Sequence, residues 1–364
     1  KAVESGFASY LIYNLVVSLR KDFDHSHLSK EMFRESSNDM QGIAIKRRWL
    51  VFEFLNYILN LWSWEKATRD GDIFFVASGS NHCALPFALF NKKFSVWVAT
   101  TLYEDKINRI KKEPCLRKIR DLLSLPILLY FEHLIFKKAN KILALSVYTR
   151  DKIIEKYKIN PTKIDIVPYS IDINKFYPLD YLQRKNNYLL FTGRLTDERK
   201  NISLLLTAFS KVRGNYPDLQ LILIGENLNK KLMGLIETLN ISNSVKILGR
   251  LAQAEELLPY YQNASLFIVP SFQEGLCISA LEALACGIPI ISTRCGGTED
   301  FIKDGYTGFL VKNNDPEELS RKIIEFLDFG ADRKKEFSNN ARDYIVNYYS
   351  PENIWQKIIE CFNL

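Results

Sequence analysis

The chain has 364 residues, of which 47% are hydrophobic and 25% are charged, and its net charge at pH 7 is +7. This length favours two domains over one, and the composition is that of an ordinary globular protein. No pair of the six cysteines has CxxC spacing, which argues against a disulfide framework or a zinc site and favours a reducing cytosol. No segment has the roughly 20 predominantly apolar residues that a membrane-spanning helix needs.

The positive charge is concentrated in the first half of the chain. Residues 1–180 contain 28 basic and 20 acidic residues, a net charge of +8, which leaves −1 for the rest. The excess is densest in Lys106–Arg120, KINRIKKEPCLRKIR, and the apolar run LLSLPILLYF follows directly. This pairing favours an anionic membrane surface as a partner, and the alternative is a solvated helix face beside a core helix. No nucleic-acid-binding signature is present, so nucleic acid is not an expected partner.

A polar stretch, Pro178–Asn187, marks the predicted boundary between two domains. The next residues, YLLFT, are predicted to form a strand, after which Gly193 allows a tight turn and a close backbone approach to a ligand. Arg194 and Lys200 then place two cations around a strand-to-helix turn. Arginine binds phosphate through two hydrogen bonds and lysine as a point charge. The alternative is a pair of solvated loop cations.

Two further predicted strands end in glycine. The segment LQLILIGEN reads as a buried strand that ends at Gly225, and VKILGR reads as a strand that ends at Gly249 and Arg250. The carboxyl ends of parallel strands share one edge of a sheet. We therefore expect the loops after these strands to converge.

The segment PSFQEGLCISALEALACGIPIIST carries the strongest signal, because it follows an apolar strand and reads as loop, helix and strand. Glu274 follows the strand, and the N–H groups of Gly275, Leu276 and Cys277 are expected to point from the helix N-terminus toward an anion. Glu282 stands eight positions after Glu274, a rise of about 12 Å in a continuous helix, so one elongated ligand could touch both carboxylates. The alternative is an ordinary βαβ unit with two surface glutamates.

Together these segments resemble the retaining glycosyltransferases of family 4, which have the GT-B fold. They occur in the family's order and spacing and cover most of Asn187–Phe326. In the first half the resemblance is looser. Ser5–Leu19 looks like the family's glycine loop and first helix, and Ala139–Pro178 looks like the strand, helix and strand that close the N-terminal domain. The matching pieces of the second half are GRLTDERKN, LILIGEN, VKILGR, PSFQEGLCISALEALACGIPIIST, GGTEDFIKDGYTGFLV and DPEELSRKI.

The resemblance implies an α/β protein with the GT-B fold, in which two Rossmann-like domains face each other across a central cleft. Residues 1–178 would form an acceptor-binding domain that lacks the family's first strand. Residues 179–364 would bind a nucleotide sugar, and the last helix would pack back on the N-terminal domain. The implied location is cytoplasmic, including the cytoplasmic face of a membrane.

The implied reaction moves a hexose from a nucleotide diphosphate sugar to a polysaccharide or glycolipid with retention of configuration. UDP-hexose is the favoured donor and GDP-mannose the next. Arg194, Lys200 and Glu274 are the implied catalytic residues, and Glu282 would hold the ribose. No metal or other cofactor is implied, because cations and the helix N-terminus can stand in for a metal. The implied donor site comprises Gly193, Arg194, Lys200, Gly225, Leu248, Arg250, Glu274, Gly275, Leu276, Cys277 and Glu282.

The chain departs from the family pattern at two places that bear on the site. Many relatives carry a histidine after the fourth N-terminal strand, where this chain reads VWVATTLYEDK. The candidates to take its place are Thr100, Thr101, Tyr103 and Glu104. Of these, Thr101 and Tyr103, together with Gly6 of the glycine loop, are expected on the acceptor side. Cys277 stands where relatives often have glycine or proline, but it keeps its backbone N–H.

Two other functions are compatible with the same fold. A sugar-nucleotide epimerase would release its product without any acceptor. A catalytically silent partner would keep the fold and bind another transferase. The presence of Arg194, Lys200 and Glu274 argues against the silent partner.

Overall fold

The computed structural model describes residues 14–19, 73–78, 80–110, 115–180, 184, 187–251 and 253–362. The described chain divides into two compact units. The C-terminal unit contains Pro168–Trp355, and the N-terminal unit contains Ser9–Val167 together with Gln356–Leu364. The division after Val167 lies before the polar stretch from which the boundary was predicted.

The N-terminal unit is built on a five-stranded sheet with the order β1-β2-β3-β4-β5. Strands β2 to β5 are parallel, and β1 pairs antiparallel with β2. Side chains on one face of β2 and β3 form a core with α6, which includes Ile135 and Phe136. The strands are β1 (Asn14–Leu19), β2 (Ile73–Ser78), β3 (Phe94–Val98), β4 (Lys141–Ala144) and β5 (Ile164–Ile166).

The prediction of a first helix within Ser5–Leu19 is wrong for its second part. Asn14–Leu19 is strand β1, and it pairs with β2 from Asn14 opposite Ser78 to Leu19 opposite Ile73. The apolar run Leu15–Val17 includes two β-branched valines, which suit a strand. The residues before Asn14, including Gly6, lie outside the described part of the chain.

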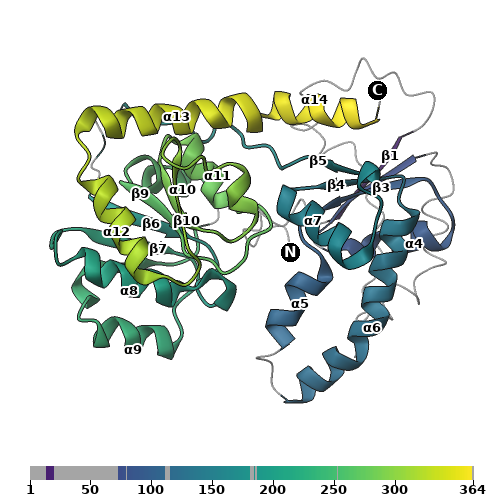
Figure 1. Cartoon of the computed structure of the whole chain (residues 1–364), viewed down its shortest axis with the longest axis horizontal. Coiled ribbons are helices and arrows are strands. Elements are labelled where there is room, and N and C mark those ends of the chain that lie inside the picture. Colours follow the sequence, from purple (N-terminus) through teal and green to yellow (C-terminus); the bar gives the residue numbers. More distant parts are fainter. Residues whose placement is uncertain are drawn as a thin grey trace. The chain divides into compact units, whose positions relative to one another are not determined.

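The helices of the N-terminal unit connect the parallel strands (Figure 1). Helix α7 is capped by Ser146, whose hydroxyl accepts a hydrogen bond from Thr149 N–H, and it ends at Lys158 in the left-handed region. Helix α14 continues into this unit, where the Phe362 ring meets the Phe75 ring edge to face at 6.0 Å. The helices are η3 (Asn81–Ala84), α4 (Leu85–Leu89), α5 (Leu102–Ile110), α6 (Cys115–Lys138), α7 (Val147–Tyr157) and η4 (Pro161–Lys163).

The C-terminal unit is built on a six-stranded, fully parallel sheet with the order β11-β10-β9-β6-β7-β8. The order reverses between β6 and β9, so the carboxyl ends of these two strands form a topological switch point, where open α/β sheets bind ligands. The strands are β6 (Tyr188–Thr192), β7 (Gln220–Ile224), β8 (Val245–Leu248), β9 (Leu266–Val269), β10 (Ile290–Thr293) and β11 (Gly308–Val311).

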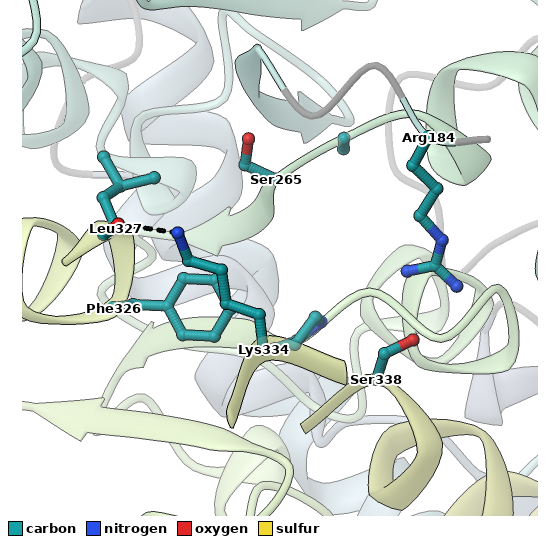
Figure 2. A pocket seen from close by; sticks show the side chains of 8 residues that line it. Arg184, Ser265, Phe326, Leu327, Lys334 and Ser338 are labelled. Carbon is teal, nitrogen blue, oxygen red and sulfur yellow. Dashed lines mark hydrogen bonds between the residues drawn. The ribbon is translucent and has the colours of Figure 1, made fainter. Parts of the chain in front are cut away.

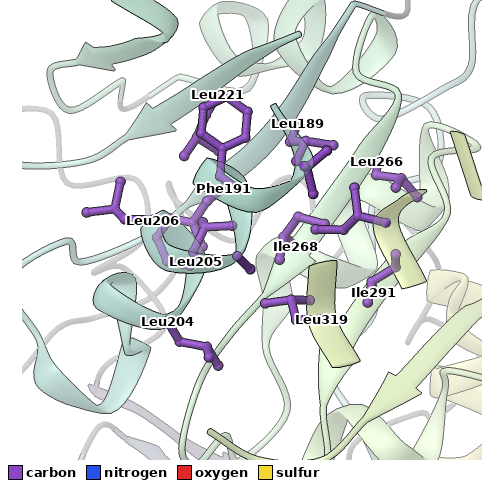
Figure 3. Packing of buried hydrophobic residues seen from close by; sticks show 14 of the residues in the cluster. Leu189, Phe191, Leu204, Leu205, Leu206, Leu221, Leu266, Ile268, Ile291 and Leu319 are labelled. Atoms are coloured by element: carbon purple, nitrogen blue, oxygen red, sulfur yellow. The ribbon is translucent and has the colours of Figure 1, made fainter. Parts of the chain in front are cut away.

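Helices cover the sheet of the C-terminal unit and create its core. Leu189 and Phe191 are two positions apart on β6, so their side chains lie on the same face of the sheet. There they pack with Leu205 of α8 and Leu319 of α12, as Figure 3 shows. This packing fixes the strands whose ends form the site. The helices are η6 (Glu198–Lys200), α8 (Ile202–Val212), α9 (Lys230–Thr238), η7 (Ser242–Ser244), α10 (Ala254–Gln262), α11 (Ile278–Ala285), η8 (Gly297–Asp300), α12 (Pro316–Leu327), α13 (Ala331–Tyr349) and α14 (Pro351–Phe362).

Within the described residues, no helix combines the length and the apolar character that crossing a bilayer requires.

Candidate functional site

The loops after β6, β7 and β8 meet at the carboxyl edge of the C-terminal sheet, as predicted. Gly193 N–H donates to the carbonyl of Ile224 at 2.9 Å, and Gly225 N–H donates to the carbonyl of Leu248 at 3.2 Å. A Cβ at Gly225 would lie 2.1 Å from the Gly193 carbonyl oxygen, so only glycine fits there. The two glycines thus bring the backbones of adjacent loops into direct contact.

The loop after β9 is tied to the loop after β10 through the backbone of Glu274. Glu274 N–H donates to the carbonyl of Cys295 at 2.7 Å, and Gly297 N–H donates to the carbonyl of Glu274 at 2.9 Å. Gly297 has no room for a side chain, because its Cβ would lie 2.0 Å from the Gly275 carbonyl oxygen. The position of Glu274 is therefore fixed from both sides.

Lys200 and Glu274 form an ion pair at this edge. Lys200 Nζ lies 2.7 Å from Glu274 Oε1, and the two side chains are only 15% and 10% exposed. Ser271 Oγ donates to the same carboxylate oxygen at 2.5 Å. Burial alone would lower the pKa of Lys200, but the Glu274 carboxylate outweighs it and the pKa is raised. The lysine is therefore held charged.

Helix α11 begins later than the sequence predicted. It starts at Ile278, and its N-cap is Cys277, which adopts the left-handed conformation with φ = 71°. Glu274 therefore lies in the loop and is not on the helix, so the rise of about 12 Å between the two glutamates does not apply. Gly275, Leu276 and Cys277, whose N–H groups were predicted to face an anion from the helix N-terminus, precede the first turn. Ala280 N–H donates to the Cys277 carbonyl at 3.1 Å, so the N–H groups of Ile278 and Ser279, together with the helix dipole, are the ones that favour an anion.

Glu282 lies on α11 and is oriented by Tyr261, a residue that the sequence analysis missed. Tyr261 OH donates to Glu282 Oε2 at 2.7 Å and lies 2.9 Å from Thr192 Oγ1 at the end of β6. Burial raises the pKa of Glu282 to about 7, and the hydrogen bond from Tyr261 opposes this rise. The Tyr261 ring packs against the ring of Phe267 on strand β9, with the ring centroids 5.9 Å apart. No sequence signal beyond an apolar helix position would have found Tyr261.

Arg194 is the more accessible of the two predicted cations. Its side chain is 60% exposed, and its guanidinium lies 2.8 Å from Asp197 Oδ2. Asp197 also binds Arg199 and caps η6 by accepting from Arg199 N–H. Burial would raise the pKa of Asp197, but Arg199 and then Arg194 lower it overall. A ligand anion would therefore compete with Asp197 for Arg194.

Glu226 is a second site residue that the sequence analysis missed. Its Oε1 accepts from both the N–H (3.1 Å) and the hydroxyl (2.8 Å) of Thr196, which connects the loops after β6 and β7. Its position directly after Gly225, at the end of a predicted strand, was the sequence feature that could have indicated it as a site residue. Leu248 ends β8 and Arg250 lies two residues beyond it, at the same edge.

The predicted acceptor-side residues that the structure describes lie at the start of α5. Thr101 is buried, and its hydroxyl accepts a hydrogen bond from Glu104 N–H at 3.3 Å. The ring of Tyr103 lies under Lys156, with Nζ 3.7 Å from the ring centroid. Thr101 therefore caps α5, whereas Tyr103 is partly exposed.

Glu132 of α6 binds the loop that leads into α5, and the sequence did not predict this role. Leu102 N–H donates to both of its carboxylate oxygens, at 2.9 and 3.1 Å. Asn81 Nδ2 donates to Glu132 at 2.7 Å and to the Thr100 carbonyl at 3.0 Å, and Tyr157 OH also donates to the carboxylate. Burial raises the pKa of Glu132 to about 7 despite these hydrogen bonds. The carboxylate thus fixes the N-terminus of α5.

A separate pocket lies at the opposite edge of the C-terminal sheet (Figure 2). Its lining includes Ser265 and Pro289, which come directly before β9 and β10. The cations that line it are already engaged by backbone carbonyls: Lys334 Nζ donates to Leu327 at 2.6 Å, and Arg184 donates to Gly287 at 2.9 Å. Because it is at the amino ends of the strands, this pocket is distinct from the candidate site.

In the part of the chain that the structure describes, there is no group of three or more histidine, cysteine, aspartate or glutamate side chains placed to hold a metal ion.

Comparison with known proteins agrees with the geometry of the C-terminal unit. Residues 181–344 match the model of the family described as glycosyl transferases group 1. An uncharacterized glycosyltransferase of Methanocaldococcus jannaschii is 29% identical over 231 residues. The match covers 63% of this chain and 60% of that relative, so the chain spans about three fifths of the relative's length. The matched residues lie within the C-terminal unit.

Solved glycosyltransferases with the GT-B fold resemble most of the chain. Sucrose-phosphate synthase from Thermosynechococcus elongatus has a TM-score of 0.71 at 19% identity, over 88% of this chain and 80% of that protein. HepE from Anabaena, solved in complex with UDP-glucose, has a TM-score of 0.68 at 17% identity, over 83% of this chain and 81% of that protein. The chain therefore has the two Rossmann-like α/β domains of this fold.

Proposed function

We propose that this protein is a retaining glycosyltransferase of family 4 that transfers a hexose from a nucleotide diphosphate sugar to a polysaccharide or glycolipid acceptor. The observation that carries the proposal is the Lys200–Glu274 ion pair at the carboxyl edge of the C-terminal sheet. Glu274 lies four residues before helix α11 begins. It supplies a cation for the diphosphate and a carboxylate for sugar hydroxyls in one place. The group 1 family match over residues 181–344 supports the same reading.

In this proposal the diphosphate leaving group is stabilised by Lys200, Arg194 and the N-terminus of α11. Negative charge grows on the leaving oxygens as the glycosidic bond breaks, and fixed cations and N–H dipoles stabilise that charge without reorganising. Arg194 would exchange Asp197 for the phosphate, since its side chain is exposed on the loop after β6. These groups would replace a divalent metal, and no enzyme base is assigned to the acceptor.

The two glutamates would bind different parts of the donor. Both side-chain contacts that the structure records for Glu274 fall on Oε1, which leaves Oε2 toward hydroxyls of the hexose. Glu282 would accept from the ribose hydroxyls while Tyr261 holds its other oxygen. Leu248 and Arg250 would lie beside the base. UDP-hexose is the favoured donor, because HepE, a structure with the same fold, binds UDP-glucose, and GDP-mannose is the next.

The N-terminal unit would bind the acceptor with the loop around Tyr103, at the cytoplasmic face of a membrane. The charge of +8 on residues 1–180 supports an anionic surface or an anionic acceptor. The implied setting is synthesis of a cell-surface polysaccharide or glycolipid.

A screen of nucleotide sugars by thermal shift tests the donor, and proton NMR of the product tests retention. A donor at 100 times its dissociation constant should stabilise the protein by about 2.7 kcal/mol. Transfer with an α-linked product from an α-linked donor would support the proposal. Conversion of the donor without any acceptor would indicate the epimerase instead. Donor binding without turnover on any glycan or lipid acceptor would indicate the silent partner.

A further inference from the structure

Helix α6 carries large apolar side chains on the face that points away from the core. Leu128, Glu132 and Ile135 are fully buried and mark the inner face of the helix. The exposed large hydrophobic residues of the same helix are Ile119, Leu122, Leu123, Ile127 and Tyr130, and we call them the α6 stripe.

The α6 stripe is one continuous surface on the helix. Its members are spaced by 3, 1, 4 and 3 positions, which at about 100° per residue places them within about 140° of the helix circumference. Leu123 is 66% exposed and Tyr130 is 62% exposed, so the stripe is not the rim of the buried core. A surface helix of a globular protein normally presents charged and polar residues on this face. Contiguous apolar surface of this kind marks an interaction site.

The charges next to the stripe are basic. Lys118 is exposed. Asp121 is buried and paired with Arg120 at 2.7 Å, so its acidic charge does not lie on the outer surface. The sequence directly before the stripe, residues 106–117, contains five lysines and arginines beside one glutamate. At the other end of the helix, Lys137 and Lys138 are exposed. An anionic partner with an apolar interior matches this arrangement.

We propose that the α6 stripe inserts into the outer layer of an anionic lipid bilayer and that α6 lies in the plane of the membrane interface. An apolar helix face bounded by Lys and Arg is the pattern of an interfacial helix, and Tyr130 provides a ring suited to the headgroup level. In this orientation α6 lies along the bilayer surface, so the proposed contact is peripheral. The inference deepens the proposed membrane location, but it does not depend on which sugar is transferred.

The test is co-sedimentation of the full-length protein with vesicles. One set contains 30% phosphatidylglycerol in phosphatidylcholine, and the other contains phosphatidylcholine alone. The wild type should bind the anionic vesicles at 0.1 M salt and lose most of this binding at 1 M salt, where the Debye length falls from about 10 Å to about 3 Å. Neutral vesicles should bind at least tenfold more weakly.

The variant Leu122→Glu/Leu123→Glu should lower binding to anionic vesicles more than tenfold, because it places two carboxylates in the apolar stripe. Its thermal midpoint should match that of the wild type, since both side chains are exposed. The matched control is Met233→Glu/Tyr348→Glu, which alters two exposed hydrophobic residues of the C-terminal unit and should bind like the wild type.

Three results would overturn the proposal. The first is wild-type protein that does not sediment with anionic vesicles at low salt. The second is equal binding by the wild type and the Leu122→Glu/Leu123→Glu variant. The third is a wild-type dimer in light scattering that this variant converts to a monomer, which would assign the stripe to a second copy of the chain. Donor binding in the same preparations reports the proposed function independently, because its residues lie in the C-terminal unit.

Discussion

Lys200 and Glu274 are separated by 74 positions in the sequence, yet Lys200 Nζ lies 2.7 Å from Glu274 Oε1. The pair joins the loop after β6 to the loop after β9 at the point where the strand order of the sheet reverses. Each residue neutralises the other in a nearly buried position. A bound diphosphate sugar would replace part of this interaction with contacts from phosphate to the lysine and from hydroxyls to the glutamate.

Removing the lysine should affect both stability and turnover. Lys200→Ala leaves Glu274 with Ser271 but without its cation, and breaking a buried pair in this way costs about 3 kcal/mol. Loss of a donor that stabilises the transition state should lower turnover by about 10²–10³. Thermal unfolding and initial rates measure the two effects. The control Lys211→Ala removes an exposed lysine that pairs with the exposed Glu317 and should change neither.

Adding Glu274→Gln to Lys200→Ala separates the two effects. The double variant removes the uncompensated carboxylate and should regain most of the lost stability, but none of the turnover. If it regained turnover as well, the lysine would act only through folding.

Arg194→Ala should leave stability nearly unchanged, because this side chain is exposed and its pair with Asp197 lies at the surface. Turnover should still fall by about 10²–10³ if Arg194 stabilises the leaving diphosphate. Steady-state kinetics at saturating donor measure this effect. Arg294→Ala, a change at an exposed arginine paired with Glu299, is the matched control. Near-normal turnover in Arg194→Ala would remove this residue from the catalytic set.

The two glutamates should separate nucleotide binding from sugar binding. Glu282→Gln should weaken the binding of UDP and of UDP-hexose alike, because the proposed partner of Glu282 is the ribose. Glu274→Gln should leave the binding of UDP unchanged and weaken only the binding of the intact donor. Calorimetric titration of both variants with both ligands decides this. Equal losses for both ligands in both variants would mean that the proposed donor orientation is reversed or wrong.

Tyr261→Phe should weaken UDP binding by about tenfold or less. It removes the one hydrogen bond from Tyr261 that orients Glu282, and such a bond contributes on the order of 1 kcal/mol. The Tyr261 hydrogen bond lowers the pKa of Glu282, so that pKa should rise further in the variant. The midpoint of UDP binding against pH would report the shift. Tyr348→Phe, at an exposed tyrosine, should behave like the wild type. An unchanged pH midpoint in Tyr261→Phe would count against the proposed orienting role.

Stability should fall as the pH rises from about 4 to 7. The pKa values of Glu132 and Glu282 are raised to about 7 by burial, whereas an unfolded glutamate titrates near 4.3. The folded state therefore binds more protons across this window, and the stabilisation is lost as the pH passes about 7. Each group should contribute on the order of 3 to 4 kcal/mol. Glu282→Gln should flatten the profile relative to the exposed control Glu255→Gln. An equally steep profile in both variants would refute the assignment.

The sequence was sufficient to predict the parts of the site that follow from strand ends and glycine. Gly193, Gly225 and Glu274 lie at the carboxyl edge of a parallel sheet because each follows a buried strand, and burial patterns are visible in sequence. The start of α11 was predicted three to four residues too early. The left-handed conformation of Cys277 that delays the helix is rare for a residue other than glycine and has no sequence signal.

Contacts between distant residues could not be predicted. The hydrogen bonds from Tyr261 to Glu282 and from Tyr157 to Glu132 depend on how helices pack on the sheets, which one sequence does not specify. Strand β1 was mistaken for a helix because the resemblance to the family outweighed the β-branched run in Leu15–Val17. Tertiary pairing with β2 determines its conformation.

Calorimetric titration of UDP-glucose and of GDP-mannose into the wild type and Lys200→Ala most directly tests whether the C-terminal unit is a nucleotide-sugar site built on the Lys200–Glu274 pair. We predict saturable binding of at least one of these donors to the wild type, with UDP-glucose the tighter. We predict a loss of at least tenfold in Lys200→Ala under conditions where circular dichroism shows the variant to be folded. Absence of binding of either donor to the wild type, or equal affinity in the folded variant, would contradict the account.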